Sequence, residues 1–293
     1  MPVTEVEGRR LPLTRLEKVI YPDTGTTKGE VLRYYAQHAG TLLPHLHGRP
    51  LSLLRYPDGP GGQTFFTKRV PPGTPSWVST CEVPRREGGT TVQVMVQDLA
   101  SLMWAANLMV EFHTPQWLAE APGEADRLIL DLDPGAPADI VSCCRVAEWL
   151  HDRMTADGLR VHAKTSGSKG LHLLSPLRPA PARLVSAYAR RLAAEAAAEL
   201  PGLAITTMAR SARPGRVFID YSQNAAAKTT AAPYTLRART RPAVSAPVTW
   251  QEVGDCTDPR ELHFELPDIA GRVEQHGDLL AGLLDPLRAR PLP

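Results

Sequence analysis

The segment Arg127–Gly135, with the sequence RLILDLDPG, constrains the fold of this chain more than any other. An apolar run of this kind, closed by a Pro-Gly turn signal, predicts a strand in the core of a sheet. Alternate strand residues share a face, so Asp131 and Asp133 point the same way, roughly 7 Å apart along the strand. Two carboxylates at that separation repel unless a cation joins them, and hard oxygen ligands suit Mg²⁺ or Mn²⁺. The structural alternative is a turn at Asp133 and a capping role for Asp131.

A third carboxylate ends another predicted strand. Asp220 follows the apolar run Val217–Ile219, and if the two strands are neighbours, three acids converge in a set suited to two-metal phosphoryl transfer. The alternative is a turn that Asp220 forms with Ser222 or Asn224. Residues 205–241 carry seven basic side chains and one acid. This balance suggests a phosphate-rich partner, although a solvated arginine-rich surface would have the same composition.

The segment KTSGSKGLHL joins two predicted strands through small residues that let the backbone approach a phosphate. Ser166 offers a hydroxyl, Lys169 a positive charge, and His172 follows on the next strand. Lys228 and Arg237, which follow the third acid, could close on a triphosphate. The spacing of a Walker A loop is absent. A plain hairpin turn with a satisfied histidine, and surface positions for the two later cations, are the alternatives.

Periodicity and capping signals predict the remaining elements. Thr27 and Glu30 have the spacing of a capping box at the start of the first helix. Helices are predicted over residues 26–40, 98–113, 139–157, 181–200 and 278–285. Strands are predicted over residues 127–133, 159–164, 170–175, 203–208 and 216–221, with a hairpin over 50–70. This order favours an α+β fold with helices around mixed sheets.

The chain has four cysteines and no CxxC pair, which excludes a zinc ribbon or a thioredoxin-type site. No apolar stretch reaches about 18 residues, and the N-terminus has no signal-peptide core. We therefore expect a cytoplasmic protein that makes no use of a membrane.

Three motifs, DLDPG, SGSKGLH and FIDYSQN, occur in an order and spacing that resemble the archaeo-eukaryotic primase superfamily. The closer resemblance is to the polymerase domain of bacterial ligase D, the non-homologous end-joining enzyme. It extends to LTRLEKVIYPDTGTTKGEVLRYY, SLMWAANLMVEFHTPQW and APYTLRARTRPAVSAPVTWQEV, and so covers nearly the whole chain.

The resemblance implies one primase-polymerase domain over residues 1–293, with mixed or antiparallel central sheets flanked by helices and catalytic carboxylates on strand ends. Residues 1–120 would contact the template and a 5′-phosphate. Residues 121–250 would form the catalytic core, and residues 251–293 a C-terminal helical segment.

The activity implied is that of a DNA-end-directed nucleotidyltransferase that prefers ribonucleotides and acts in bacterial non-homologous end joining. Its cofactors would be two Mn²⁺ or Mg²⁺ ions, and its substrates nucleoside triphosphates. The implied partners are broken or gapped DNA with a 5′-phosphate, a Ku-like protein and a separate ATP-dependent DNA ligase, at the nucleoid. No KxDG ligase motif or His-rich nuclease segment appears, so a stand-alone polymerase module is expected.

Site residues follow from the same resemblance. Asp131 and Asp133 would hold both metals, and Asp220 the metal that activates the primer 3′-hydroxyl. The positions matching nucleotide contacts are His113, Ser166, Lys169, His172 and Arg237. The positions matching DNA contacts are Lys18 and Lys28 for the 5′-phosphate, Phe65 and Phe66 for template bases, and Arg213 for the primer end. Arg15 stands beside the 5′-phosphate pocket, where the family often has Asn.

Three alternatives stay open. A weakly catalytic module could bridge DNA ends and recruit a Ku-like protein or a ligase. A primase-like enzyme in replication or damage tolerance could start chains without a primer. A metal-dependent sugar-nucleotide transferase could use the DxD motif alone, and would leave the basic stretch around Asp220 without a purpose.

Overall fold

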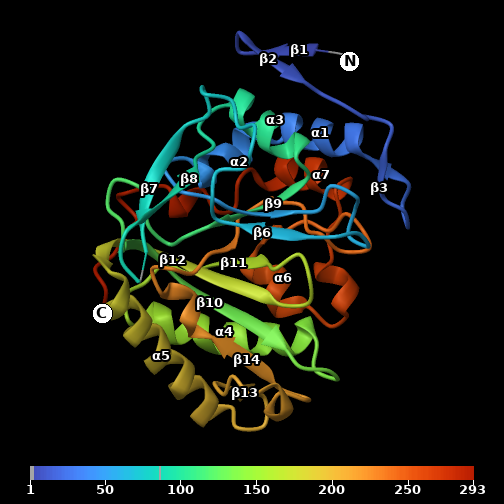
Figure 1. Ribbon diagram of the computed structural model, residues 1–293. Helices are drawn as coiled ribbons and strands as arrows, with labels where there is room; N and C mark the ends of the chain where they lie inside the picture. The colour runs from blue at the N-terminus through green and yellow to red at the C-terminus, as the bar shows by residue number, and fades with distance from the viewer. Residues whose placement is uncertain (1–2, 86) are drawn as a thin grey trace. The chain divides into compact units, whose positions relative to one another are not determined.

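The structure is a computed structural model that describes residues 3–85 and 87–293. The chain divides into two compact units, each built from separate stretches of sequence (Figure 1). The first unit runs to Pro115 and adds Thr229–Ser245 and Phe264–Gln275. The second unit comprises Gln116–Lys228, Ala246–His263 and His276–Pro293. The single domain expected over 1–293, with its portions at 1–120, 121–250 and 251–293, stays a prediction.

The second unit is built on a six-stranded sheet in the order β13–β14–β10–β12–β11–β16. Its strands are β10 (Glu124–Pro134), β11 (His162–Thr165), β12 (Leu171–Pro181), β13 (Ala204–Ile205), β14 (Val217–Asp220) and β16 (Pro247–Val248). Neighbouring strands are antiparallel except β13 and β14, which are parallel. The predicted mixed sheet is therefore confirmed, and the three motif-bearing strands β14, β10 and β12 lie side by side in it.

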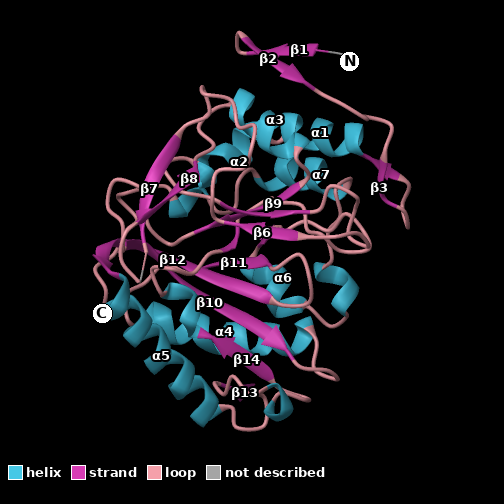
Figure 2. Cartoon of the chain, viewed as in Figure 1, coloured by secondary structure: helices cyan, strands magenta, loops and turns pink. Residues whose placement is uncertain are grey.

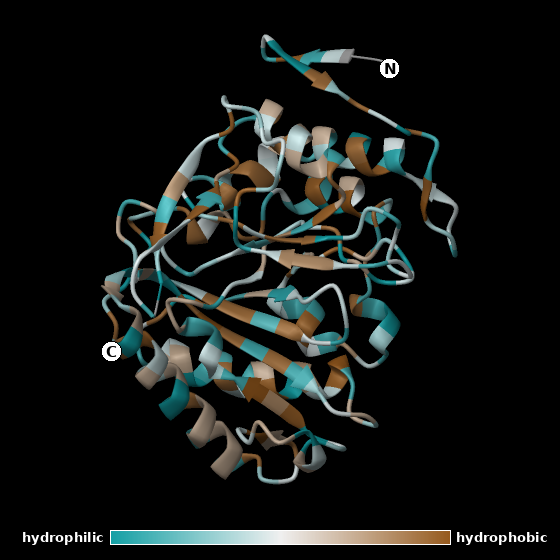
Figure 3. Cartoon of the chain, in the orientation of Figure 1, coloured by the Kyte–Doolittle hydropathy of each residue, from teal (hydrophilic) through white to brown (hydrophobic). Residues whose placement is uncertain are grey.

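Helices α4 (Ile140–Ala156) and α5 (Ala182–Glu199) pack on this sheet and confirm the two helices expected there (Figure 2). Asp139 caps α4 by accepting bonds from the backbone N–H groups of Val141 and Ser142. The strands supply a dense apolar core, and the hydrophobic residues of β14 are visible in Figure 3. The unit also contains α6 (Trp250–Asp255) and the 3₁₀ turns η1 (Arg210–Ala212), η2 (Tyr221–Asn224), η3 (Pro259–Leu262) and η4 (Ala281–Leu283).

The first unit contains an antiparallel sheet in the order β15–β9–β5–β6, with helices beside it. Its strands are β15 (Thr230–Ala231), β9 (Val110–Thr114), β5 (Ser52–Arg55) and β6 (Phe65–Thr67), and β5 with β6 forms the predicted hairpin. Its helices are α1 (Lys28–Gln37), α2 (Ala39–Leu46), α3 (Leu99–Asn107) and nearly all of α7 (Asp268–His276). Three two-stranded ribbons complete it: β1 (Val3–Val6) with β2 (Arg9–Pro12), β3 (Val19–Tyr21) with β4 (Thr26–Thr27), and β7 (Thr80–Pro84) with β8 (Thr90–Val94).

The capping box predicted for the first helix is present. The Thr27 hydroxyl accepts a bond from the Glu30 backbone N–H, and the Glu30 carboxylate accepts one from the Thr27 backbone N–H. Such a box satisfies two donors that a helix start otherwise leaves unpaired. The helix therefore begins at Lys28, two residues later than predicted.

One predicted helix is too long, and another is wrong. The helix expected over 98–113 ends at Asn107, Met109 adopts a φ of 56°, and Val110–Thr114 is strand β9. A run that is apolar on every side has no periodicity to separate a buried helix from a buried strand. The terminal helix expected over 278–285 is only the short turn η4, because the helix lies earlier, in α7, and ends before Gly277 at a φ of 66°.

Among the described residues, none of the helices is both long and apolar enough to span a bilayer.

Candidate active site

Three carboxylates meet on one face of the second unit's sheet. Strands β10 and β14 are neighbours, and their register places Asp220 directly opposite Asp131. Residues opposite each other in an antiparallel pair project from the same face with Cβ atoms about 5 Å apart. Asp133, two residues further along β10, projects from the same face as Asp131. The convergence expected if these strands were neighbours is therefore present at the level of register.

The charges of these acids are incompletely balanced. Burial, together with the charges of Asp131 and Asp220, raises the pKa of Asp133 to about 6 against the opposing influence of Lys169 and Arg213. A carboxyl group with a raised pKa beside another acid is in a strongly negative environment that a bound cation would relieve. Asp131 and Asp133 therefore fit the oxygen-ligand chemistry of Mg²⁺ or Mn²⁺.

The Asp220 carboxylate, in contrast, accepts hydrogen bonds from the residues that follow it in the chain. One of its carboxylate oxygens accepts bonds from the Ser222 backbone N–H, at 2.9 Å, and from the Ser222 hydroxyl, at 2.6 Å. The other oxygen accepts a bond from the Gln223 amide at 2.8 Å. Asp220 thus caps η2, as the turn alternative anticipated. Across the described part of the chain, no group of three or more His, Cys, Asp or Glu side chains is arranged to hold a metal ion. The oxygen that accepts the Gln223 bond keeps a second lone pair with which it is able to bind a cation.

His172 flanks the carboxylates on the other side. It lies opposite Asp131 across the β10–β12 pair, and its Nε2 is 3.4 Å from a carboxylate oxygen of Asp131. On the next strand, Lys164 lies opposite His172. One cross-strand row therefore contains Asp220, Asp131, His172 and Lys164, from four adjacent strands. The sequence analysis gave Lys164 no role. The alternation of KTSGSKGLH could not show it, because the row depends on strand pairing.

The loop between β11 and β12 is shaped by Ser166. Its hydroxyl accepts bonds from the backbone N–H groups of Ser168 and Gly170, each at 3.2 Å, and its own N–H donates to the Gly170 carbonyl. Gly170 is required at the end of the loop, because a Cβ there would lie 2.0 Å from the Leu132 carbonyl oxygen. The loop is thus held tightly against β10, between the two acids of the DLD motif.

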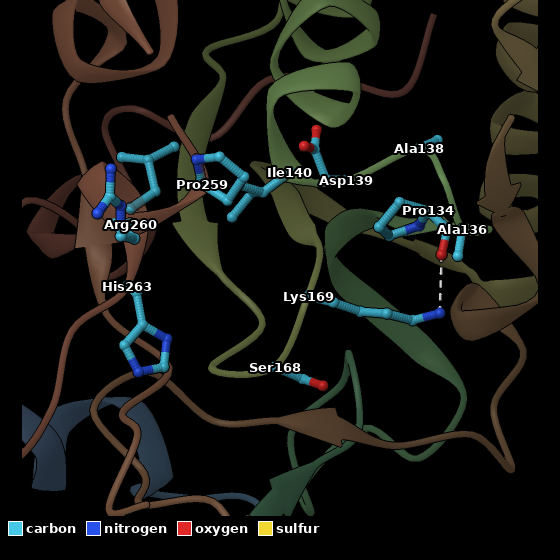
Figure 4. Close-up of a pocket in the computed structure, with 11 residues that line it drawn as sticks. Pro134, Ala136, Ala138, Asp139, Ile140, Ser168, Lys169, Pro259, Arg260 and His263 are labelled. Carbon is cyan, nitrogen blue, oxygen red and sulfur yellow. Dashed lines mark hydrogen bonds between the residues drawn. The ribbon is translucent and has the colours of Figure 1, made fainter. Parts of the chain in front are cut away.

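Lys169 extends from this loop over a pocket of about 360 Å³ (Figure 4). Its ammonium group donates a hydrogen bond to the Pro134 carbonyl at 2.7 Å. Arg260 and His263 line the other side of the pocket. Because the Lys169 side chain also lowers the pKa of Asp133, it lies within electrostatic reach of the carboxylates.

Arg213 lies within electrostatic reach of the carboxylates, whereas no interaction between Lys228 and the carboxylates is observed among the described residues. The Arg213 guanidinium stacks 3.7 Å from the centre of the Phe218 ring, donates to the Met208 carbonyl, and acts on the pKa of Asp133. Lys228 is exposed at the end of its stretch, and its proposed role toward a triphosphate stays a prediction.

In the first unit, Glu111 organises two of the predicted nucleotide residues. Its carboxylate is 3.0 Å from His113 Nε2 and accepts bonds from Arg237 Nε, at 2.9 Å, and from the Ala238 backbone N–H. Burial alone would raise the pKa of Glu111, but His113 and Arg237 hold it at about 2. Sequence analysis missed Glu111. The alternation in VEFHT would have placed it on the face of His113 had that segment been taken as a strand.

The aromatic pair predicted to meet template bases is exposed. Phe65 and Phe66 are 44% and 55% exposed, so neither ring anchors the hairpin in the core. The Phe66 ring makes an edge-to-face contact with the imidazole of His113, with centres 5.8 Å apart.

Three cations gather at the start of α1. Backbone bonds from Lys28 to the Lys18 carbonyl, and from Gly29 to the Leu16 carbonyl, dock the turn that carries Arg15 and Lys18 onto the helix. Lys28 is 7% exposed, and burial together with the charges of Lys18 and Arg15 lowers its pKa to about 8. Lys18 also donates to the Pro57 carbonyl and pairs with Asp58. A lysine with such a lowered pKa would gain from a bound anion.

The predicted site residues thus fall into two sets. The second unit holds Asp131, Asp133, Asp220, Ser166, Lys169, His172, Arg213 and Lys228, and the first unit holds Arg15, Lys18, Lys28, Phe65, Phe66, His113 and Arg237.

Comparison with known proteins gives consistent matches. A family model described as the LigD primase-polymerase domain matches residues 27–280. The multifunctional non-homologous end joining protein LigD of Mycolicibacterium smegmatis is 41% identical over 278 residues, which cover 94% of this chain and 36% of that protein. The bifunctional LigD of Bacillus subtilis is 28% identical over 271 residues, covering 92% of this chain and 43% of that protein. The chain thus spans well under half the length of these relatives.

A solved structure agrees with the sequence matches. The polymerase domain from Mycobacterium tuberculosis ligase D, in complex with DNA, superimposes with a TM-score of 0.89 at 40% sequence identity. The match covers 94% of this chain and 98% of that one. At this identity and coverage, it confirms the primase-polymerase fold.

Proposed function

Because the chain belongs to the LigD primase-polymerase domain family, we propose that it is a DNA-end-directed nucleotidyltransferase that extends ends and fills gaps during non-homologous end joining. The observation that carries this proposal is the register of Asp220, Asp131 and His172 on adjacent strands, with Asp133 on the same face. Family membership alone would not secure activity, whereas this arrangement keeps the groups that phosphoryl transfer needs.

Asp131 and Asp133 would hold divalent cations, with Asp220 as a further ligand through the oxygen that accepts the Gln223 bond. Bound Mn²⁺ or Mg²⁺ would supply Lewis-acid activation of a primer 3′-hydroxyl and of the phosphate it attacks. The protein's own part is to position the nucleotide. Lys169 and His172 bind the triphosphate, and Ser166 keeps the loop between them in shape.

Residues of the first unit would act on the other parts of the substrate. Glu111 holds the Arg237 guanidinium in one orientation and so presets it for phosphate. Phe65 and Phe66 offer exposed rings on which template bases of any sequence could stack. We expect ribonucleotides to be preferred, and a Ku-like protein and an ATP-dependent DNA ligase to be the partners in end joining.

Primer extension on a short-gap DNA with a 5′-phosphate tests the proposal. We expect extension with Mn²⁺ or Mg²⁺, more efficient with ribonucleotides than with deoxyribonucleotides. Binding to the gap without extension under either cation would favour the end-bridging alternative. Synthesis that starts without a primer would favour the primase-like one. The absence of both DNA binding and primer extension would overturn the assignment.

The buried lysine at the start of α1 makes a pH-dependent prediction. Only the charged form of Lys28 attracts a 5′-phosphate, so affinity is full below its pKa of about 8 and falls as the pH rises through that value. Binding to a 5′-phosphorylated gap should weaken about tenfold between pH 7 and pH 9, a range in which the phosphate charge barely changes. Fluorescence anisotropy at constant ionic strength measures this.

The matched variant is Lys28→Arg, which stays charged over the whole range and should abolish the pH dependence. DNA with a 5′-hydroxyl is the second control and should show little change with pH. The same loss of affinity on 5′-hydroxyl DNA, or its persistence in Lys28→Arg, would contradict a phosphate contact at Lys28.

A further inference from the structure

Two cysteine thiols of the second unit are in contact. Cys144 lies in the second turn of α4, and Cys256 is the C-cap residue of α6. Their side chains are hydrogen-bonded to each other. The Cys256 thiol also donates to the Asp258 carbonyl, with its sulfur 3.6 Å from that oxygen. Because the Cys256 proton points to Asp258, the Cys256 sulfur is the acceptor and the Cys144 S–H the donor of the bond between the thiols.

The other two cysteines have different surroundings. Cys143 precedes Cys144 in α4, but its thiol donates to the Leu132 carbonyl of β10 at 3.5 Å, so the two neighbours face different elements. Cys81 belongs to the first unit and is half-buried. All four thiols are free. Cys144 and Cys256 therefore form a pair that the sequence, in which they are more than 100 positions apart, does not show.

We propose that Cys144 and Cys256 are a reversible disulfide site that hydroperoxides oxidise. The Cys256 sulfur would attack one oxygen of hydrogen peroxide, which breaks the O–O bond, gives a sulfenic acid and releases one water. The Cys144 sulfur would then attack the Cys256 sulfur and displace its hydroxyl group, which leaves with the Cys144 proton as a second water. The two sulfurs together lose two electrons, and the peroxide gains them. Exchange with a small thiol such as glutathione reverses the reaction.

The surroundings of the pair set the rates of the two steps. Cys256 is 6% exposed and Cys144 2% exposed, so Cys256 is the thiol that a small oxidant reaches first. Burial raises the pKa of both thiols, which leaves little thiolate and makes the first step slow. The second step is favoured by the existing contact. A disulfide of about 2.05 Å needs the sulfurs to come closer, and Cys256 lies where the chain leaves its helix in an extended conformation.

The bond would join two walls of the pocket that contains Lys169. Helix α4 begins at Ile140, which lines this pocket, and the chain after Cys256 leads into η3, whose Pro259 and Leu262 also line it (Figure 4). The two elements already pack against each other. Oxidation would therefore replace a packing contact behind the pocket by a covalent link. This inference does not depend on the proposed polymerase activity.

Treatment of the native wild-type protein with hydrogen peroxide, followed by alkylation of the remaining thiols under denaturing conditions, tests the proposal. We expect two of the four thiols to resist alkylation and the mass before alkylation to fall by about 2 Da. Tryptic peptide 128–145 should be linked to the peptide that ends at Arg260. Dithiothreitol should restore all four thiols. Oxidation should raise the melting temperature by about 5 °C, because the bond closes a long loop.

Cys143→Ala is the matched control, because peptide 128–145 contains both Cys143 and Cys144. This variant should still form the link, whereas Cys144→Ala and Cys256→Ala should not. Thermal melting of the reduced variants shows that they are folded, and the wild-type result does not depend on them. Four reactive thiols after peroxide, over-oxidation without a link, or a link that needs Cys143 would overturn the proposal. A melting temperature that falls on oxidation would also overturn it, because the bond would then not fit the native fold.

Discussion

Asp131→Asn is expected to abolish primer extension, with a loss of about a thousandfold or more in the single-turnover rate. Asp131 is the centre of the candidate site, with Asp220 opposite it on one side, His172 on the other, and Asp133 two residues along the strand. Replacing Asp131 by an uncharged residue removes the proposed cation ligand that lies next to both Asp133 and Asp220. Rapid-quench extension of a gapped primer, with saturating nucleotide and Mn²⁺, measures the loss.

The fold should survive this change. Asp131 raises the pKa of Asp133, so the two carboxylates repel each other, and an uncharged amide should leave the melting temperature equal to or above that of the wild type. Asp126→Asn is the matched control, because it removes a partly exposed carboxylate from the same strand and should retain extension. Extension by Asp131→Asn at more than a few per cent of the wild-type rate would contradict the carboxylate assignment.

The strands that carry the acids could be predicted from sequence, but their arrangement could not. The apolar runs before Asp131 and Asp220 predicted β10 and β14, since burial leaves a direct trace in residue type. Which strands pair, and in what register, depends on contacts between distant residues. The facing of Asp220 with Asp131, and the place of Lys164 in the row, therefore emerged only from the structure.

The error over residues 98–113 had a consequence for the site. Treating β9 as the end of a helix hid the alternation that places Glu111 and His113 on one face. The buried Glu111 carboxylate fixes the positions of His113 and Arg237. The residue type alone does not show that this glutamate is buried or which residues it binds.

The basic stretch over residues 205–241 also has a different meaning in three dimensions. Arg213 lies near Asp133 in the second unit, whereas Arg237 is bonded to Glu111 in the first. Arg241 pairs with Glu265, also in the first unit. The stretch is therefore divided between the two units, which its composition alone does not show.

Gly170→Ala is expected to have the largest effect of any single methyl group at the site. The added Cβ would lie 2.0 Å from the Leu132 carbonyl oxygen and 3.1 Å from its carbonyl carbon. Both atoms are backbone, so the start of β12 has to move away from β10 between Asp131 and Asp133. We expect a loss of about 3 kcal/mol in the free energy of unfolding, at the upper end for overpacking, as measured by urea denaturation.

Gly202→Ala is the matched control, because a Cβ at that exposed turn would meet no atom within 4 Å. It should change the free energy of unfolding by no more than about 0.5 kcal/mol. Gly170→Ala should also lower extension in the fraction that stays folded, because the shift carries His172 and Lys169 away from the carboxylates. Wild-type stability and extension in Gly170→Ala would mean that the loop is not held against β10 as described. Reduced extension with full stability would mean that the close contact between Gly170 and the Leu132 carbonyl matters for the geometry of the site and not for the stability of the fold.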